Sequence, residues 1–144
     1  MEPEHPSPED PRQPVGVFVY GTLQRGQKRA PLWPRPPLEV LPATTQGRLF
    51  DLVPYPALLP GEGPVAGELW CFRAVDLEAT LEVLDAIEGH AGTADDLYVR
   101  RLIECQCSDG RVRRAYAYFF NRPGRLMAAR PIEPGSHGAA RWPT

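Results

Sequence analysis

The chain has 144 residues, 42% of them apolar, and a formal net charge of −2. This length suits one domain with a hydrophobic core and is short for two. The negative charge gives no reason to expect nucleic-acid binding, and no run of about 18 apolar residues could form a membrane-spanning helix. The first residues lack the basic start and apolar centre of a secretory signal, so we expect a cytoplasmic protein.

Both ends of the chain differ in composition from its middle. Residues 1–14 contain five prolines among charged side chains. Such a segment buries too little apolar surface to offset the entropy lost on ordering, so we expect a disordered leader. We expect one domain over residues 15–128. A C-terminal tail, residues 129–144, is rich in proline, glycine and small residues, and we assign it no element.

Most of the domain has the residue pattern of β-strands. A short apolar run at residues 15–20 predicts a buried strand that Gly21 ends. Similar patterns predict further strands at residues 46–52, 65–72, 98–107 and 112–120. Turns are expected at residues 53–56, 61–64 and 108–110, the last joining two strands into a hairpin. Four prolines between residues 28 and 41 leave room there for at most one helical turn.

One helix is expected, with Asp76 as its N-cap and Gly89 just past its C-terminal end. Leu77, Leu81 and Leu84 recur at helical spacing and predict a buried stripe. A strand-rich chain with one helix indicates an α+β fold, in which a helix packs on a small mixed barrel or curled sheet.

Glu88 lies in an unexpected position on this helix. On a wheel of about 100° per residue it is centred on the leucine stripe, whereas Glu78 and Asp85 lie toward the flank of the helix and Glu82 lies farther out toward solvent. An unpaired buried carboxylate raises its pKa, and a near-neutral pKa suits a general base. The alternative is that Glu88 lies in the last turn and bends toward water.

A second unusual feature follows the first strand, at Tyr20, Gly21, Thr22 and Leu23. Glycine allows consecutive backbone N–H groups to point into one concavity, where an anion or a carbonyl oxygen could lie. A strand that ends in glycine is also common without any ligand. No Cys/His or Ser/His/Asp set has a spacing that predicts catalysis. The three cysteines are expected to be free thiols that pack as small hydrophobic groups.

Taken in order, these segments resemble the γ-glutamylcyclotransferase-like family, which includes the γ-glutamylamine cyclotransferases and AIG2-like proteins. The matching motifs are Val-Phe-Val-Tyr-Gly-Thr-Leu at residues 17–23, Gly-Arg-Leu-Phe-Asp at 47–51, Tyr-Pro-Ala-Leu-Leu-Pro at 55–60, Val-Ala-Gly-Glu-Leu-Trp at 65–70, Leu-Asp-Ala-Ile-Glu-Gly at 84–89 and Tyr-Val-Arg-Arg at 98–101. Two departures bear on substrate preference. Residues 25–31 lack the asparagine often found there, and His90 stands where an aromatic ring is common.

The resemblance implies a small mixed β-barrel with flanking helices and a cavity. Glu88 would be the general acid/base, and the loop of Tyr20, Gly21, Thr22 and Leu23 would bind the γ-glutamyl head through backbone N–H groups. Tyr98 matches a tyrosine near the family's site. The partner implied is a small γ-glutamyl amine or amino acid, cyclised to 5-oxoproline with release of the free amine. No metal or cofactor is implied.

Two other functions stay open at this point. The first is a binding module on the same fold, in which Glu88 recognises an ammonium group without chemistry. The second is a barrel that binds single-stranded nucleic acid through an aromatic and basic strand face of Arg114, Tyr116, Tyr118 and Phe120. The sequence sets neither the substrate nor the oligomeric state. Candidate walls of a substrate pocket are Trp33, Tyr55, Trp70 and the C-terminal segment.

Overall fold

The structure is a computed structural model that describes residues 13–53, 55–122, 124, 126, 129–135 and 138–143. The elements within these residues are, in chain order, β1 (Pro14–Val19), the 3-10 turn η1 (Ala30–Leu32), β2 (Glu39–Asp51), β3 (Pro56–Cys71), α1 (Ala74–Glu88), β4 (Tyr98–Cys107), β5 (Val112–Phe120) and β6 (Arg130–Pro131).

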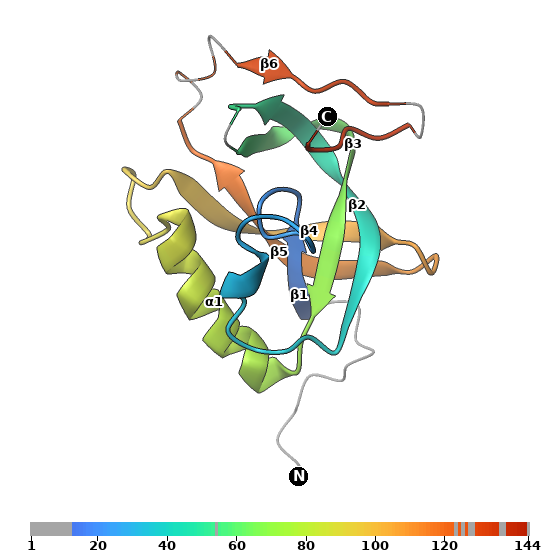
Figure 1. Ribbon diagram of the computed structural model, residues 1–144, viewed down its shortest axis with the longest axis vertical. Helices are drawn as coiled ribbons and strands as arrows, with labels where there is room; N and C mark the ends of the chain where they lie inside the picture. The colour runs from blue at the N-terminus through green and yellow to red at the C-terminus, as the bar shows by residue number, and fades with distance from the viewer. Residues whose placement is uncertain are drawn as a thin grey trace.

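The strands close into a small barrel. Their order is β3-β1-β5-β4-β2-β6, and an additional pairing of β2 with β3 joins the two sides (Figure 1). The pairing of β1 with β5 is parallel, whereas the other strand pairings are antiparallel. The expected mixed barrel is therefore confirmed, with one α-helix on its outside among the described residues.

The hairpin of β2 and β3 is longer than the sequence suggested. The two strands pair from Glu39 opposite Cys71 to Asp51 opposite Pro56, with one shift of register between Gln46 and Arg48. The turn predicted at residues 61–64 is wrong, because this segment continues β3 at the shift. There the side-chain Oε1 of Gln46 accepts a hydrogen bond from the backbone N–H of Gly63 at 2.9 Å. Prolines inside both strands explain the error, since they usually mark a strand end.

The hairpin of β4 and β5 has the predicted limits, with residues 108–110 as its turn. The helix differs at its start. It begins at Ala74, so Asp76 is in the first turn and is not the N-cap, which is Arg73. The C-terminal end is as expected, because Gly89 adopts the left-handed conformation that ends a helix. The buried face comprises Leu77, Thr80 and Leu84, while Leu81 is half-buried.

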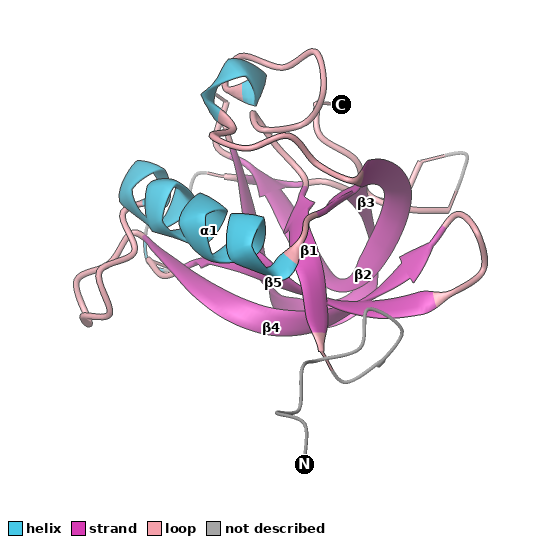
Figure 2. Cartoon of the chain, turned by 90° about the horizontal axis from the view of Figure 1, so that it is seen from below, coloured by secondary structure: helices cyan, strands magenta, loops and turns pink. Residues whose placement is uncertain are grey.

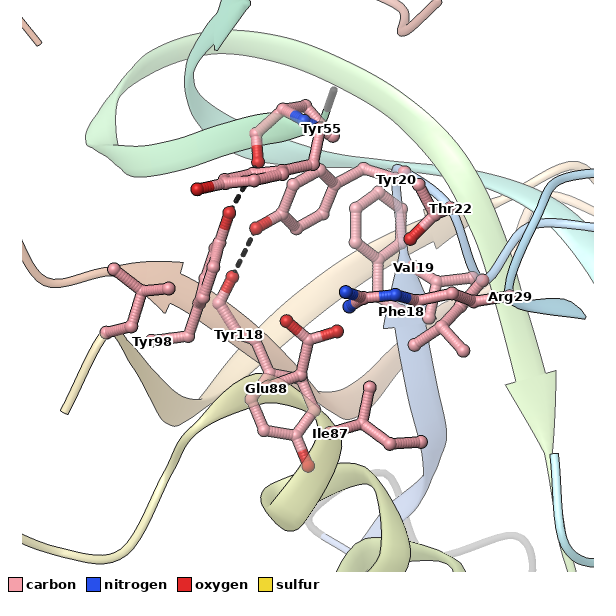
Figure 3. A pocket seen from close by; sticks show the side chains of 14 residues that line it. Phe18, Val19, Tyr20, Thr22, Arg29, Tyr55, Ile87, Glu88, Tyr98 and Tyr118 are labelled. Atoms are coloured by element: carbon pink, nitrogen blue, oxygen red, sulfur yellow. Dashed lines mark hydrogen bonds between the residues drawn. The ribbon is translucent and has the colours of Figure 1, made fainter. Parts of the chain in front are cut away.

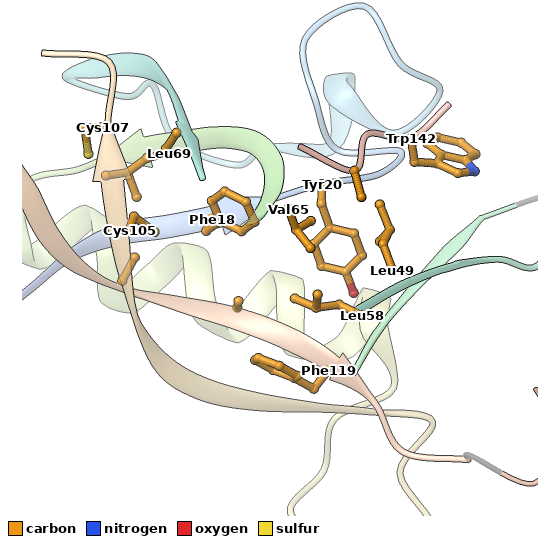
Figure 4. Close-up of a cluster of buried hydrophobic side chains, with 14 of the residues drawn as sticks. Phe18, Tyr20, Leu49, Leu58, Val65, Leu69, Cys105, Cys107, Phe119 and Trp142 are labelled. Carbon is orange, nitrogen blue, oxygen red and sulfur yellow. The ribbon is translucent and has the colours of Figure 1, made fainter. Parts of the chain in front are cut away.

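Two apolar layers hold the fold together. Helix α1 packs on the outside of the barrel across β1 and β5 (Figure 2). Side chains alternate along β1, so Val17 and Val19 face the helix while Phe18 points into the barrel. The barrel interior is filled by Phe18, Leu49, Leu58, Val65, Leu69 and Phe119 (Figure 4). All three cysteines are free and buried, as predicted.

The C-terminal tail, to which the sequence assigned no element, takes part in the fold. Its residues 130 and 131 form β6 beside β2, and Ala140 bridges to Val65 of β3. Trp142 is buried against the barrel core. Of the expected leader, residues 1–12 lie outside the described residues, and Pro14 already belongs to β1.

The strand face considered for nucleic-acid binding is largely covered. Tyr118 and Phe120 are buried in the layer beneath the helix. Tyr116 is half-buried, with the guanidinium carbon of Arg100 5.0 Å from its ring centroid. Base stacking needs open ring faces, so this face does not offer the expected platform. Among the helices described, none has the length and apolarity needed to span a bilayer.

Close packing of β1 on β3 gives a test of the barrel. A Cβ atom added at Gly16 would lie 1.8 Å from the carbonyl oxygen of Trp70. We expect Gly16→Ala to lower the free energy of unfolding by about 2 kcal/mol or more, because backbone must move. Gly135→Ala is the matched control, since nothing lies within 4 Å of an added Cβ there. Equal urea-denaturation midpoints for the two variants would contradict this packing.

Candidate active site

A cavity of about 110 Å³ opens where the end of α1 meets the loop that follows β1. It is lined by all six residues predicted to form the site: Tyr20, Gly21, Thr22, Leu23, Glu88 and Tyr98 (Figure 3). Those residues come from the first strand and loop, the helix end and the start of β4. The fold thus brings together groups separated by up to 78 positions in the chain.

Glu88 is the last residue of α1, and its carboxylate points into this cavity. Leu84, one turn earlier on the same face, is fully buried. The alternative that Glu88 bends away toward water is therefore wrong. Loss of hydration raises the pKa of Glu88 from 4.5 to about 7, although the positive charge of Arg29 acts in the opposite direction. Near neutral pH this carboxyl group is present in both protonation states, as an acid/base catalyst requires.

The helix end that carries Glu88 is fastened to the barrel by a polar network. The Tyr118 hydroxyl donates a hydrogen bond to Oδ1 of Asp85 at 2.6 Å. Arg100 of β4 donates to Oδ2 of the same carboxylate at 3.0 Å. Asp85 lies three residues before Glu88, so this network fixes the turn from which Glu88 projects. Sequence reasoning placed Asp85 on the flank of the helix but did not find these partners.

Two tyrosines of the cavity, Tyr20 and Tyr98, already donate their hydroxyl protons to backbone carbonyl groups. Tyr20 donates to the backbone carbonyl of Tyr118, and Tyr98 donates to that of Pro56 at 2.8 Å. Burial, with the Glu88 charge as a lesser cause, raises the pKa of both phenols well above 10. Both therefore stay protonated and present oxygen lone pairs to a ligand. Glu88 is the only carboxyl group among the described residues that line the cavity.

The loop after β1 presents backbone donors without partners. Among the hydrogen bonds of the described residues, none uses the N–H of Gly21, Thr22 or Leu23, whereas the N–H of Gln24 and of Arg25 are both bonded. Gly21 is required for close approach, because an added Cβ would lie 2.8 Å from Cγ of Pro56. Three consecutive N–H groups at a cavity, with no acceptor among the described residues, can bind an anion or a polarised carbonyl oxygen.

The carbonyl side of this loop is anchored. The N–H of Arg29 donates to the Thr22 carbonyl at 2.8 Å. The indole N–H of Trp33 donates to the Leu23 carbonyl at 2.9 Å. These two bonds hold the loop on the side of its carbonyl groups.

The cavity walls differ in part from those expected. Tyr55 lines the cavity as proposed, but Trp33 and Trp70 stack on each other with ring centroids 4.2 Å apart and do not line it. The described part of the C-terminal segment contacts the loop through a bond from Gln24 to the Trp142 carbonyl, without forming a wall. Sequence reasoning missed Arg29, which does line the cavity. It lies in a proline-rich connection without periodicity, so no local signal pointed to it.

Comparison with known proteins identifies relatives of this chain. Residues 17–138 match the family described as γ-glutamyl cyclotransferase, AIG2-like. The γ-L-glutamyl-butirosin B γ-glutamyl cyclotransferase of Niallia circulans is 32% identical over 112 residues, which are 76% of this chain and 69% of that protein. The γ-glutamylcyclotransferase family protein YtfP of Escherichia coli K12 is 31% identical over 107 residues, covering 74% of this chain and 83% of that protein.

Solved structures support the fold. An AIG2-like protein of Mus musculus superposes with a TM-score of 0.58 at 22% identity, over 90% of this chain and 96% of that one. A protein of Arabidopsis thaliana superposes with a TM-score of 0.61 at 22% identity, over 90% of this chain and 71% of that one. The match over residues 17–138 and the two relatives at 31% and 32% identity show that the chain belongs to the γ-glutamyl cyclotransferase, AIG2-like family and is a γ-glutamylcyclotransferase-like enzyme.

Proposed function

We propose that the protein cyclises the γ-glutamyl group of a small γ-glutamyl amine or amino acid to 5-oxoproline, and that Glu88 is the general acid/base. One observation carries the proposal: among the described residues that line the cavity, one carboxyl group, with a pKa of about 7, lies beside three backbone N–H groups to which no described residue supplies an acceptor. The Niallia circulans relative, whose name specifies a γ-glutamyl compound, is consistent with this substrate class.

The reaction needs no nucleophile from the protein. In a γ-glutamyl compound the α-amine can reach the γ-carbonyl carbon of the same molecule and close a five-membered ring. The work of the enzyme is to hold the chain folded, so that amine and carbonyl meet in a reactive geometry. A compact cavity with largely aromatic and aliphatic walls suits this task, because its walls restrict the conformations of a bound chain.

Proton transfer assigns two tasks to Glu88. The α-ammonium must lose a proton before its nitrogen can attack, and the ionised carboxylate accepts that proton. When the bond between the γ-carbon and the departing nitrogen breaks, the protonated carboxyl group returns a proton to that nitrogen. The ring nitrogen then gives up one of its two remaining protons to the Glu88 carboxylate, which passes it to the departing amine. One ammonium proton thus stays on the ring nitrogen and two pass to the departing amine, so no water is consumed.

Negative charge develops on the γ-carbonyl oxygen as the ring closes. The N–H groups of Gly21, Thr22 and Leu23 are the donors that the cavity offers to this oxygen. Donors fixed before the reaction stabilise such charge without reorganisation. Tyr20 and Tyr98 have only acceptor lone pairs left, which suits them to receive hydrogen bonds from the substrate ammonium.

The first prediction concerns Glu88 itself. Glu88→Gln should fold normally and lose roughly 100- to 10,000-fold in kcat, the usual contribution of a general acid/base. Glu82→Gln, at an exposed position of the same helix, is the matched control and should keep wild-type activity. The assay is release of 5-oxoproline from γ-glutamyl-lysine, γ-glutamyl-alanine and glutathione. Wild-type turnover by Glu88→Gln would overturn the assignment, and binding without product by the wild-type protein would favour a binding module.

The second prediction concerns pH. Because a base works in its ionised form, kcat/KM should rise with pH through an acidic limb near 7, the pKa of Glu88 in the free protein. The substrate ammonium stabilises the carboxylate in the complex, so any acidic limb of kcat should lie at lower pH. The alkaline side must be corrected for titration of the substrate amine. An acidic limb at or below 4.5 would show that Glu88 is well hydrated.

A further inference from the structure

We infer that Arg29 binds the α-carboxylate of the γ-glutamyl substrate and is a specificity-determining residue of this enzyme. The inference rests on the proposed function, because it assumes that Glu88 receives the α-ammonium. Together the two side chains would form a pair of opposite charges that matches the zwitterionic head of a γ-glutamyl compound.

The position of Arg29 is set by backbone contacts on both sides. Its N–H donates to the Thr22 carbonyl at 2.8 Å, and its own carbonyl accepts from the N–H of Leu32 at 2.9 Å. These bonds fix Arg29 between the loop after β1 and the turn η1. The half-buried side chain is thereby directed into the cavity, where its guanidinium group faces the carboxylate of Glu88 (Figure 3).

The charges of Arg29 and Glu88 interact electrostatically, but the two side chains do not form an ion pair. The guanidinium is close enough to lower the pKa of Glu88. Within the described part of the chain, however, no salt bridge of 4.0 Å or less joins them, and no hydrogen bond involves the Arg29 guanidinium. Space therefore remains between an anionic and a cationic group, and both keep bonding capacity for a ligand.

The substrate has charges that match this arrangement. Its ammonium and carboxylate are attached to the same α-carbon, so when the ammonium reaches Glu88 the carboxylate must lie next to it. A guanidinium binds a carboxylate through two parallel N–H donors, the strongest geometry available to a side chain. A carboxylate on the departing group would lie beyond the γ-amide, farther along the substrate. Proximity to Glu88 therefore favours the α-carboxylate.

Two other arginines near the site are engaged elsewhere. Arg100 pairs with Asp85 and Arg25 pairs with Glu68. Among the described residues that line the cavity, Arg29 is the one with a positive charge. If Arg29 binds the α-carboxylate, the N–H groups of Gly21, Thr22 and Leu23 remain for the γ-carbonyl oxygen. Arg29 then recognises the substrate, and the loop N–H groups stabilise the charge that develops in the reaction.

The test pairs a change in the protein with a change in the substrate. The γ-glutamyl compound turned over fastest in the panel is compared with its analogue that has an α-carboxamide in place of the α-carboxylate. Arg29→Gln should lose roughly 10- to 100-fold in kcat/KM on the carboxylate compound, mainly through KM, and change little on the carboxamide. Arg29→Lys should lose less activity than Arg29→Gln, since lysine keeps the positive charge but lacks the two parallel N–H donors of the guanidinium.

A second arginine of the same loop provides the control. Arg25→Gln, on the same loop but exposed and paired with Glu68, should keep the wild-type preference between the two compounds. Equal losses by Arg29→Gln on both compounds would indicate a structural role and overturn the inference, as would no loss on either. If Arg29→Gln does not fold, Arg29→Lys decides: unchanged discrimination between the two compounds overturns the inference.

Calorimetry separates this inference from the proposed function. Binding of γ-glutamyl-alanine and of its α-carboxamide analogue, a pair that does not depend on turnover, is measured to Glu88→Gln and to the double variant that also carries Arg29→Gln. If no compound is cyclised by the wild-type protein, but the carboxylate compound binds more tightly than the carboxamide only when Arg29 is present, the recognition role stands and the proposed reaction fails. If the wild-type protein cyclises a substrate but the preference for the carboxylate compound does not depend on Arg29, the proposed reaction stands and the recognition role fails. Absence of binding to any variant overturns the inference.

Discussion

A carboxylate that the fold keeps partly dehydrated governs the site. Helix α1 ends at Glu88, on the same face as the buried Leu84, and the side chain enters a cavity with mostly apolar walls. This arrangement has an energetic cost. Between pH 4.5 and about 7 the folded state holds a proton on Glu88 that the unfolded state has lost, so this group lowers stability as the pH rises. Retaining a destabilising group is understandable where a near-neutral carboxyl group has work to do.

Hydrogen bonds on two sides of the cavity hold the helix end that carries Glu88 and the loop that faces it. The bonds from Tyr118 and Arg100 to Asp85 fix the last turn of the helix against β4 and β5. On the opposite wall, the bonds from Arg29 and Trp33 fix the loop after β1. Donors, acceptors and charges are thus positioned before a ligand arrives, as efficient electrostatic catalysis requires.

What could be predicted from the sequence followed from local patterns. Helical periodicity placed Glu88 on the buried face, and the alternating residues of β4 and β5 gave the correct limits for that hairpin. The hairpin of β2 and β3 was predicted too short, because its length depends on pairing across the sheet and tolerates prolines at a shift of register. The start of the helix was misplaced because Asp76 is a good N-cap residue that the longer helix places in its first turn.

The parts of the site that could not be predicted from the sequence depend on contacts between segments that are distant in the chain. Arg29 reaches the cavity only because its connection folds back on Thr22, and nothing in residues 25–31 signals this return. Similarly, Asp85 could be placed on the helix flank, but its partners on β4 and β5 follow from how the helix crosses the barrel. Tertiary contacts of this kind have no period to detect in one sequence.

The proposed chemistry depends most directly on the ionisation of one side chain. We would titrate the carboxyl carbon of Glu88 by ¹³C NMR in the ligand-free protein, using Glu88→Gln to assign the resonance. We expect a midpoint of about 7, with burial as the cause. A midpoint near 4.5, the ordinary value, would show a hydrated carboxylate and contradict the central claim.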